Sequence, residues 1–98
     1  NPVVDRAVAD LLAKDFAGLP VYATDNHRVR LSAAWMIEQC GWKGHREGDA
    51  GVSQQHALVL VNYGQASGQQ LLELANAIGA SVKNRFDIEL KPEPLIHL

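Results

Sequence analysis

The feature that most constrains the fold is a long amphipathic helix, predicted between Ser67 and about Phe86. Ser67 and Gln70 have the Ser-x-x-Gln spacing of a capping box, in which the two side chains satisfy backbone donors at the start of a helix. Apolar residues then recur at helical spacing along one stripe, which comprises Leu71, Leu74, Ala75, Ile78, Val82 and Phe86. A helix with one apolar stripe buries that stripe against a second layer, which the rest of the chain has to supply.

Two flanking segments predict that this second layer is a sheet. Residues 57–61 form a continuous apolar run, which is typical of a strand covered on both faces. Residues 88–91 alternate between apolar and charged side chains, as in a strand, and Pro92 would end its pairing. Strand, helix and strand would form a β-α-β unit, with a right-handed crossover if the strands are parallel.

The N-terminal half predicts two further helices and one short strand. An apolar stripe at helical spacing runs from Val4 to Phe16, and Gly18 and Pro20 follow it. Asp5 is placed to cap this helix or to favour its first turn.

A strand with one wet face is expected at 28–31, where apolar residues alternate with arginines. Ser32 is a candidate cap for a second helix, deeply buried, which would run through Cys40 and end at Gly41. Residues 41–55 contain four glycines and predict loops with a short extended piece. We therefore expect a small α+β domain, in which a mixed sheet containing the C-terminal β-α-β unit is covered by about three helices.

Composition excludes several classes of protein. The chain has 98 residues, with nine Lys and Arg against eleven Asp and Glu, and this charge balance argues against a protein that binds nucleic acid or anionic membranes. The longest apolar run is far shorter than the ~20 residues that span a bilayer. A single cysteine, Cys40, cannot form an internal disulfide and fits a reducing compartment. We expect a soluble, cytoplasmic domain without a targeting segment, cut from a longer protein.

Motifs for several chemistries are missing from the sequence. There is no phosphate-binding loop, no Gly-x-Gly-x-x-Gly turn and no His-Glu-x-x-His pair. The four histidines are scattered, which favours surface or hydrogen-bonded roles over a set of metal ligands. We therefore expect no metal site.

One unusual segment is Pro92-Glu93-Pro94. The two prolines restrict the backbone on both sides of Glu93 and hold it on a stiff, non-helical stem. Acid–base catalysis needs a carboxylate placed in this way, because it depends on geometry before pKa. The spacing alone nevertheless favours a solvated glutamate at the end of a strand, with proline protecting the sheet edge.

Two other segments have both a functional and a plain interpretation. His56 directly precedes the apolar run, where an imidazole could meet an anionic or uridine-bearing ligand, or could have no role. The loop of Trp42, Lys43 and Gly44, with Arg46 nearby, could contact phosphate, or could be a solvated loop tethered by one aromatic ring. Without a resemblance, the residues lead only to a soluble α+β domain.

Five segments in order resemble blocks of one bacterial flavoenzyme family, UDP-N-acetylenolpyruvoylglucosamine reductase (MurB). They are Asn1-Pro-Val-Val4, Leu31-Ser-Ala-Ala-Trp-Met-Ile-Glu-Gln-Cys-Gly-Trp-Lys-Gly44, Gly48-Asp-Ala-Gly-Val52, His56-Ala-Leu-Val-Leu-Val-Asn62 with Gly64-Gln-Ala-Ser67, and Phe86-Asp-Ile-Glu-Leu-Lys-Pro-Glu93. The resemblance covers essentially all of the chain and is confined to the family's C-terminal, substrate-binding domain. In the last block, Asp87 stands where the family usually has glycine, and Pro94 follows where it usually has valine.

The resemblance implies a function for the complete enzyme. It would reduce the enolpyruvyl ether of UDP-N-acetylglucosamine to UDP-N-acetylmuramate for peptidoglycan, with NADPH reducing a bound FAD. Glu93 matches a glutamate that assists protonation of the substrate, which reverses the weighting from spacing alone. Asn1 and His56 match substrate-binding positions. The FAD-binding domains, the catalytic serine and an arginine would lie outside this chain, so the isolated chain is expected to be inactive and to bind no cofactor.

Two other functions compete with this one. The same scaffold could be a binding module that holds a UDP-sugar without reducing it. A weaker alternative is an interaction module that uses the predicted helix 67–86, although its polar face is typical of solvated surface.

Overall fold

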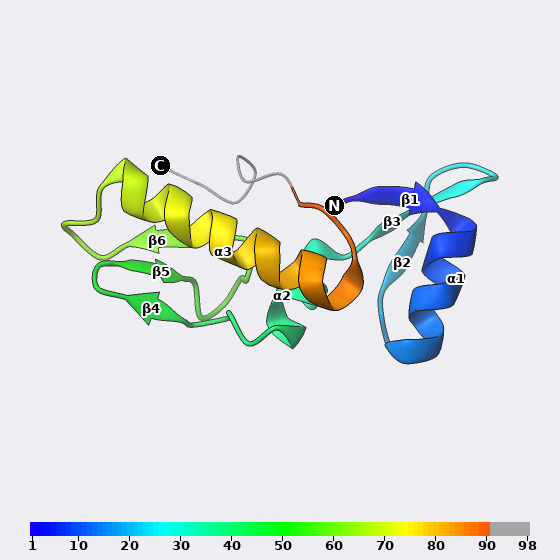
Figure 1. Ribbon diagram of the computed structural model, residues 1–98, viewed down its shortest axis with the longest axis horizontal. Helices are drawn as coiled ribbons and strands as arrows, with labels where there is room; N and C mark the ends of the chain where they lie inside the picture. Colours follow the sequence, from blue (N-terminus) through cyan, green and yellow to red (C-terminus); the bar gives the residue numbers. More distant parts are fainter. Residues whose placement is uncertain (91–98) are drawn as a thin grey trace.

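The computed structural model describes residues 1–90 and confirms an α+β fold. Its described part has three helices and two separate three-stranded sheets, arranged along a long axis (Figure 1). The elements in chain order are β1 (Val3–Asp5), α1 (Arg6–Asp15), β2 (Val21–Ala23), β3 (Arg28–Leu31), α2 (Ala33–Gln39), β4 (Arg46–Glu47), β5 (Ala50–Val52), β6 (Leu60–Asn62) and α3 (Gly68–Phe86).

The first sheet and helix α1 form a small lobe, residues 1–31. Its strands have the order β1-β3-β2, and both neighbours run antiparallel to β3. As the alternation predicts, Val29 and Leu31 of β3 are buried, whereas Arg28 and Arg30 are exposed. Helix α1 packs against β1 and β3 and buries its Ala9 in the core.

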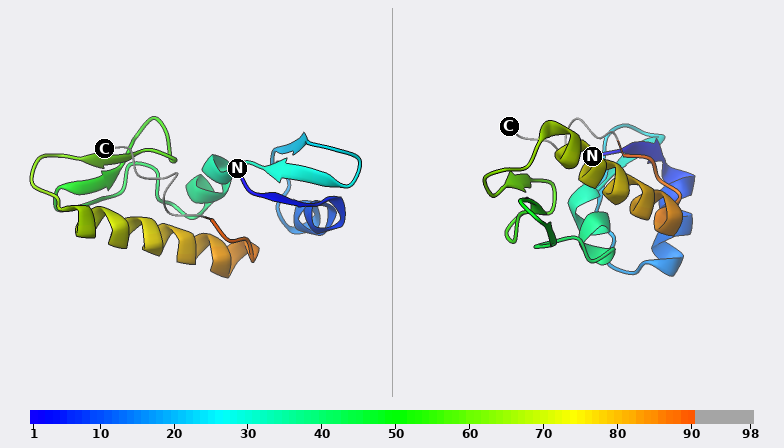
Figure 2. Two further views of the ribbon diagram at one scale, coloured as in Figure 1. Left: turned by 90° about the horizontal axis from the view of Figure 1, so that it is seen from above. Right: turned by 60° about the vertical axis from the view of Figure 1, so that its left-hand side comes forward.

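The second sheet, α2 and α3 form a large lobe, residues 32–90. Strand β5 lies at the centre of the sheet, antiparallel to β4 and to β6. Helix α3 packs against this sheet and against α2, which lies between the two sheets in Figures 1 and 2. All six residues of the predicted α3 stripe are buried, so the helix does supply the central layer of the core.

An aromatic cluster joins the lobes. The rings of Phe16, at the end of α1, and Phe86, at the end of α3, have their centroids 4.4 Å apart. Trp35 of α2 contacts Phe86 with a centroid distance of 6.2 Å. Buried side chains of both lobes therefore belong to one continuous core.

Two of the predicted helix starts are confirmed in detail. Ser67 Oγ accepts from the Gln70 N–H at 3.1 Å, and the Gln70 side chain accepts from the Ser67 N–H at 2.8 Å, which completes the capping box. Ser32 Oγ accepts from the Trp35 N–H at 3.1 Å and caps α2. Helix α3 ends at Asp87, whose φ of 57° is left-handed and whose N–H donates to the Lys83 carbonyl.

The first helix begins later than predicted, because Val4 belongs to a strand. Residues Val3–Asp5 pair with β3, and only from Arg6 onward does the chain become helical. Asp5 occupies the N-cap position but makes no side-chain capping bond. The pairing partner lies more than twenty residues away along the sequence, where a local apolar stripe gives no sign of it.

The predicted single mixed sheet with a C-terminal β-α-β unit is replaced by two antiparallel sheets. Strand β6 begins only at Leu60, because His56 to Val59 form a turn in which the Val59 N–H donates to the His56 carbonyl at 3.1 Å. Residues 88–90 form no strand, and β6 pairs with β5 instead. The left-handed turn at Asp87 redirects the chain immediately before the segment predicted to be the last strand.

Candidate functional site

The three residues predicted to form the site do not all lie in the described part of the chain. Glu93 falls outside residues 1–90, so its predicted role stays a prediction. Asn1 leads into β1, and His56 lies in the connection between β5 and β6. Asn1 and His56 therefore belong to different lobes, and no hydrogen bond within residues 1–90 joins them.

Asn1 is held by the start of α2. Its Oδ1 accepts a hydrogen bond from the backbone N–H of Ala33, the first residue of that helix, at 3.1 Å. The next residue is also fixed, because the Pro2 carbonyl accepts from the Leu31 N–H at 3.0 Å. Since Oδ1 is the engaged atom, the amide turns its Nδ2–H₂ group away from Ala33, and Nδ2 has no acceptor within residues 1–90. Asn1 thus offers two hydrogen-bond donors from a fixed, exposed position.

His56 is exposed on a turn that the side chain of Ser53 organises. Ser53 Oγ accepts from the N–H groups of Gln55 and His56, at 3.1 and 3.2 Å. These bonds hold the backbone of His56, while its ring makes no hydrogen bond within the described residues. The imidazole is therefore available to a ligand. Ser53 was not among the residues predicted to matter for the site, although Ser at the start of a turn is a common signal for such bonds.

The loop after α2 fits the plain interpretation given to it. Trp42 is half-buried and meets the ring of His45 edge-on, at a centroid distance of 4.9 Å. Lys43 Nζ pairs with Glu38 Oε1 at 3.0 Å. Arg46 stacks on the Tyr63 ring at 4.0 Å. These groups already have partners inside the large lobe, so we assign the loop no phosphate site.

The guanidinium of Arg46 also makes polar contacts along its edge. Its Nε donates to the Gly48 carbonyl at 2.6 Å, and its Nη2 pairs with Asp49 Oδ1 at 3.1 Å. The guanidinium thereby braces the β4–β5 hairpin. An arginine bound in this way would have to exchange existing partners before it could bind a phosphate.

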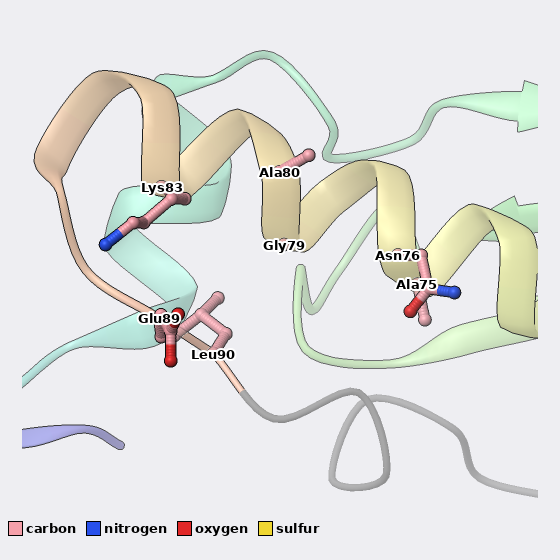
Figure 3. Close-up of a pocket in the computed structure, with 7 residues that line it drawn as sticks. All are labelled: Ala75, Asn76, Gly79, Ala80, Lys83, Glu89 and Leu90. Atoms are coloured by element: carbon pink, nitrogen blue, oxygen red, sulfur yellow. The ribbon is translucent and has the colours of Figure 1, made fainter.

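One cavity of about 240 Å³ lies between α3 and the residues that follow it (Figure 3). It is lined by Ala75, Asn76, Gly79, Ala80, Lys83, Glu89 and Leu90. Lys83 Nζ pairs with Asp87 Oδ1 at 3.0 Å, and that hydrogen bond raises the pKa of the Lys83 ammonium. Neither Asn1 nor His56 lines this cavity, so it is separate from the predicted substrate-binding positions.

Two further features are absent from residues 1–90. No group of three or more His, Cys, Asp or Glu side chains in this part of the chain could hold a metal ion. No helix within it has the length and apolar character needed to cross a membrane.

Comparison with known proteins gives one consistent family. Residues 1–97 match the family described as "UDP-N-acetylenolpyruvoylglucosamine reductase, C-terminal domain". The chain is similar to UDP-N-acetylenolpyruvoylglucosamine reductase from Xanthomonas oryzae pv. oryzae (strain PXO99A), with 56% identity over 97 residues, which is 98% of this chain and 28% of the relative. It is also similar to the protein of the same name from Xylella fastidiosa (strain 9a5c), with 55% identity over 94 residues, covering 95% of this chain and 27% of the relative. The chain thus spans little more than a quarter of these relatives.

Proposed function

We propose a reductase function on the premise that this chain belongs to the family of UDP-N-acetylenolpyruvoylglucosamine reductase C-terminal domains. In this proposal the chain is the substrate-binding domain of a longer enzyme. That enzyme reduces the enolpyruvyl ether of UDP-N-acetylglucosamine to UDP-N-acetylmuramate in peptidoglycan synthesis. The observation that carries the proposal is the family match over residues 1–97, supported by 56% identity to a reductase of that name.

The cavity beside α3 is too small to hold the flavin that this chemistry requires. Pockets for drug-sized ligands span about 300–1,000 Å³, and the cavity beside α3 has a volume of about 240 Å³. FAD is larger than such ligands. As the family resemblance implies, we assign FAD, and the NADPH that would reduce it, to the part of the complete enzyme outside this chain.

Asn1 would bind the substrate through its amide nitrogen. The bond from the Ala33 N–H to Oδ1 fixes the amide and leaves Nδ2–H₂ to donate. Two donors on one atom suit a carboxylate, phosphate or amide oxygen, all of which a UDP-sugar with an enolpyruvyl group carries. Because the amide is fixed before the ligand arrives, little side-chain entropy would be lost on binding.

His56 would contact the UDP portion, and Glu93 would act at the other end of the substrate. Reduction of the enolpyruvyl group adds one hydrogen to each carbon of its double bond, and one of the two arrives as a proton. Glu93 would assist the donation of that proton by a group outside this chain. These roles come from the family resemblance, and the exposed ring of His56 is compatible with a contact to a ligand.

The test combines this chain with the flavin-binding part of the enzyme, expressed as a second polypeptide. NADPH oxidation is followed with and without the enolpyruvyl UDP-sugar. We expect substrate-dependent oxidation only when both polypeptides are present. Glu93→Gln should lower kcat by about 100-fold or more with little change in KM, because proton transfer acts in the transition state.

Two matched variants sharpen this test. Glu89→Gln removes an exposed carboxylate four residues away and should leave kcat unchanged. Asn1→Asp keeps an oxygen for the Ala33 N–H but loses the donors, so KM should rise while thermal stability is kept. If UDP-sugar binds the two-part enzyme with no oxidation while the partner carries its flavin, the chain is a binding module and the reductase proposal is wrong.

A further inference from the structure

The sheet of the small lobe has one face that no described element covers. Strand β3 alternates its side chains, so Val29 and Leu31 point into the core while Arg28 and Arg30 point to the opposite face. The register places Val3 of β1 and Tyr22 of β2 on either side of Arg30. Residues directly opposite in a ladder share a face, so Val3, Arg30 and Tyr22 form one row across it. We call this row and Arg28 the open face.

The open face combines two exposed large apolar side chains with two arginines. Val3 is 48% exposed and Tyr22 is 46% exposed. Val3 and Tyr22 are the two exposed large apolar side chains of the small lobe that lie on this face. The others are Val8 and Leu11 on α1, and Val21, which pairs with the buried Leu31. Helix α1 packs on this sheet and covers only one of its two faces (Figure 2). Arg30 has no hydrogen bond or ion pair within residues 1–90, in contrast to Arg28, which pairs with Asp25 at 3.5 Å.

We infer that the open face is the docking surface for the part of the enzyme that precedes this chain. This inference rests on the proposed function, in which the chain is the C-terminal domain of a longer reductase. The matched relatives have nearly three-quarters of their length outside the matched segment. The family is described as a C-terminal domain, which places most of that length before the residue equivalent to Asn1.

The path of the chain brings that preceding part to the open face. Asn1 is tied to Ala33, Pro2 is tied to Leu31, and Val3 already belongs to the face. Each preceding residue can move the chain by only ~3.8 Å, so the polypeptide enters beside this surface. The hydrogen bonds of Asn1 and Pro2 fix the position at which the preceding chain meets the small lobe.

The small size of the patch favours a covalently linked occupant over a separate one. A stable interface between free proteins buries about 1,200–2,000 Å², which a row of three side chains does not provide. A tethered domain docks at an effective concentration near millimolar, so a smaller surface is enough. We expect the docked surface to be apolar opposite Val3 and Tyr22, with a carboxylate opposite Arg30.

The experiment measures thiol labelling in the complete protein that carries this chain. In a background whose native cysteines are serine, Tyr22→Cys and Val3→Cys report on the open face. Leu72→Cys, at an α3 residue that is 38% exposed, is the matched control. For each variant, the rate of maleimide labelling in native buffer is divided by the rate in denaturant. Two reporters are used so that one poorly folded variant does not decide the result.

We expect the thiols of the Tyr22→Cys and Val3→Cys variants to react at least about tenfold more slowly than the thiol of Leu72→Cys, because labelling then requires the interface to open. Equal ratios for all three variants would overturn the inference. Protection that disappears on dilution would also overturn it, since the occupant would then be a second copy. The readout does not use NADPH oxidation. A protein with protected thiols but no reductase activity would therefore contradict the proposed function and leave the docking surface standing.

Discussion

The small lobe and the large lobe differ in how completely they cover their apolar side chains. The large lobe surrounds α3 with a sheet on one side and α2 on another, and only Tyr63 and Leu72 among its large apolar side chains in residues 32–90 are exposed. The small lobe has a single helix on a three-stranded sheet and exposes five, including Leu11 at 63%. Two layers of secondary structure can share a core only where they face each other. The large lobe therefore covers most of its large apolar side chains with its own elements, whereas the small lobe leaves more of them exposed.

The largest expected effect comes from the centre of the large lobe. Ile78→Ala should lower the free energy of unfolding by about 3–4 kcal/mol, because truncation removes buried methyl groups and leaves a cavity. Ile78 is fully buried on α3. Chemical denaturation of the chain checks this value. Val29→Ala, at an equally buried position of the small lobe, should cost less and should reduce hydrogen-exchange protection mainly in β1–β3. Equal losses of global stability for the two variants would contradict this difference between the lobes.

A second prediction concerns the tight packing inside the large-lobe sheet. A Cβ at Gly51 would lie 2.8 Å from Cε2 of Tyr63 and 3.1 Å from the His45 carbonyl oxygen. Gly51→Ala should therefore destabilise the chain by about 1–3 kcal/mol, as overpacking usually does. Thermal unfolding of Gly51→Ala, of Tyr63→Ala and of the double variant measures the coupling. The double variant should lose less stability than the two single variants lose when their losses are added. The contact with the His45 backbone should still prevent full rescue.

A third prediction isolates the start of α3. Ser67→Ala should lower stability by about 1 kcal/mol, because the N–H of Gln70 loses its acceptor at the helix N-terminus. Ser81→Ala is the control, since its hydroxyl donates to the Ala77 carbonyl within the same helix and caps nothing. Circular dichroism during denaturation gives both values. If the two variants lost equal stability, the capping box would not contribute to the large lobe.

The smallest effect is expected in the β2–β3 hairpin of the small lobe. Asp25 Oδ1 accepts from the N–H groups of His27 and Arg28, at 2.8 Å each, and these bonds lower the pKa of the Asp25 carboxyl below 3.8. The carboxylate therefore favours the hairpin above pH 3.8, and this contribution is lost as the pH falls through the lowered pKa.

Amide exchange of His27 and Arg28 measures this dependence. Their protection should fall in acid in the wild-type chain, whereas Asp25→Asn, which keeps the oxygen but does not titrate, should show no such step. A step that is identical in both proteins would assign the acid sensitivity to other groups of the small lobe.

Patterns among neighbouring residues in the sequence predicted the elements that are stabilised by contacts between neighbouring residues. Helix α3 with its capping box, helix α2 with its Ser32 cap, and the alternating strand β3 were all predicted to within a residue or two. Each of these features depends on residues that are close together along the chain. Of the site, the place of His56 before the apolar run already suggested a ligand contact as one of two interpretations, whereas Asn1 was singled out only through the family resemblance.

What the sequence did not predict depends on contacts between distant residues. Strand β1 exists because it pairs with β3, and no periodicity near Val4 reports that pairing. The apolar run 57–61 was predicted to be a strand, but Ser53 holds the backbone of His56 in a turn. Only the end of the run, from Leu60 onward, pairs with β5. The bond from Ala33 to Asn1 spans more than thirty residues and is equally invisible to a local pattern.

The left-handed residue after α3 has a consequence for the segment that directly follows it. At Asp87, one positive φ sets the direction in which residues 88–90 leave the helix. A β-branched residue at this position would strain that torsion, since only glycine and a few short polar residues adopt it readily. A substitution that forces residue 87 out of this conformation would therefore change the direction in which the chain leaves α3, and it would move the buried side chain of Ile88.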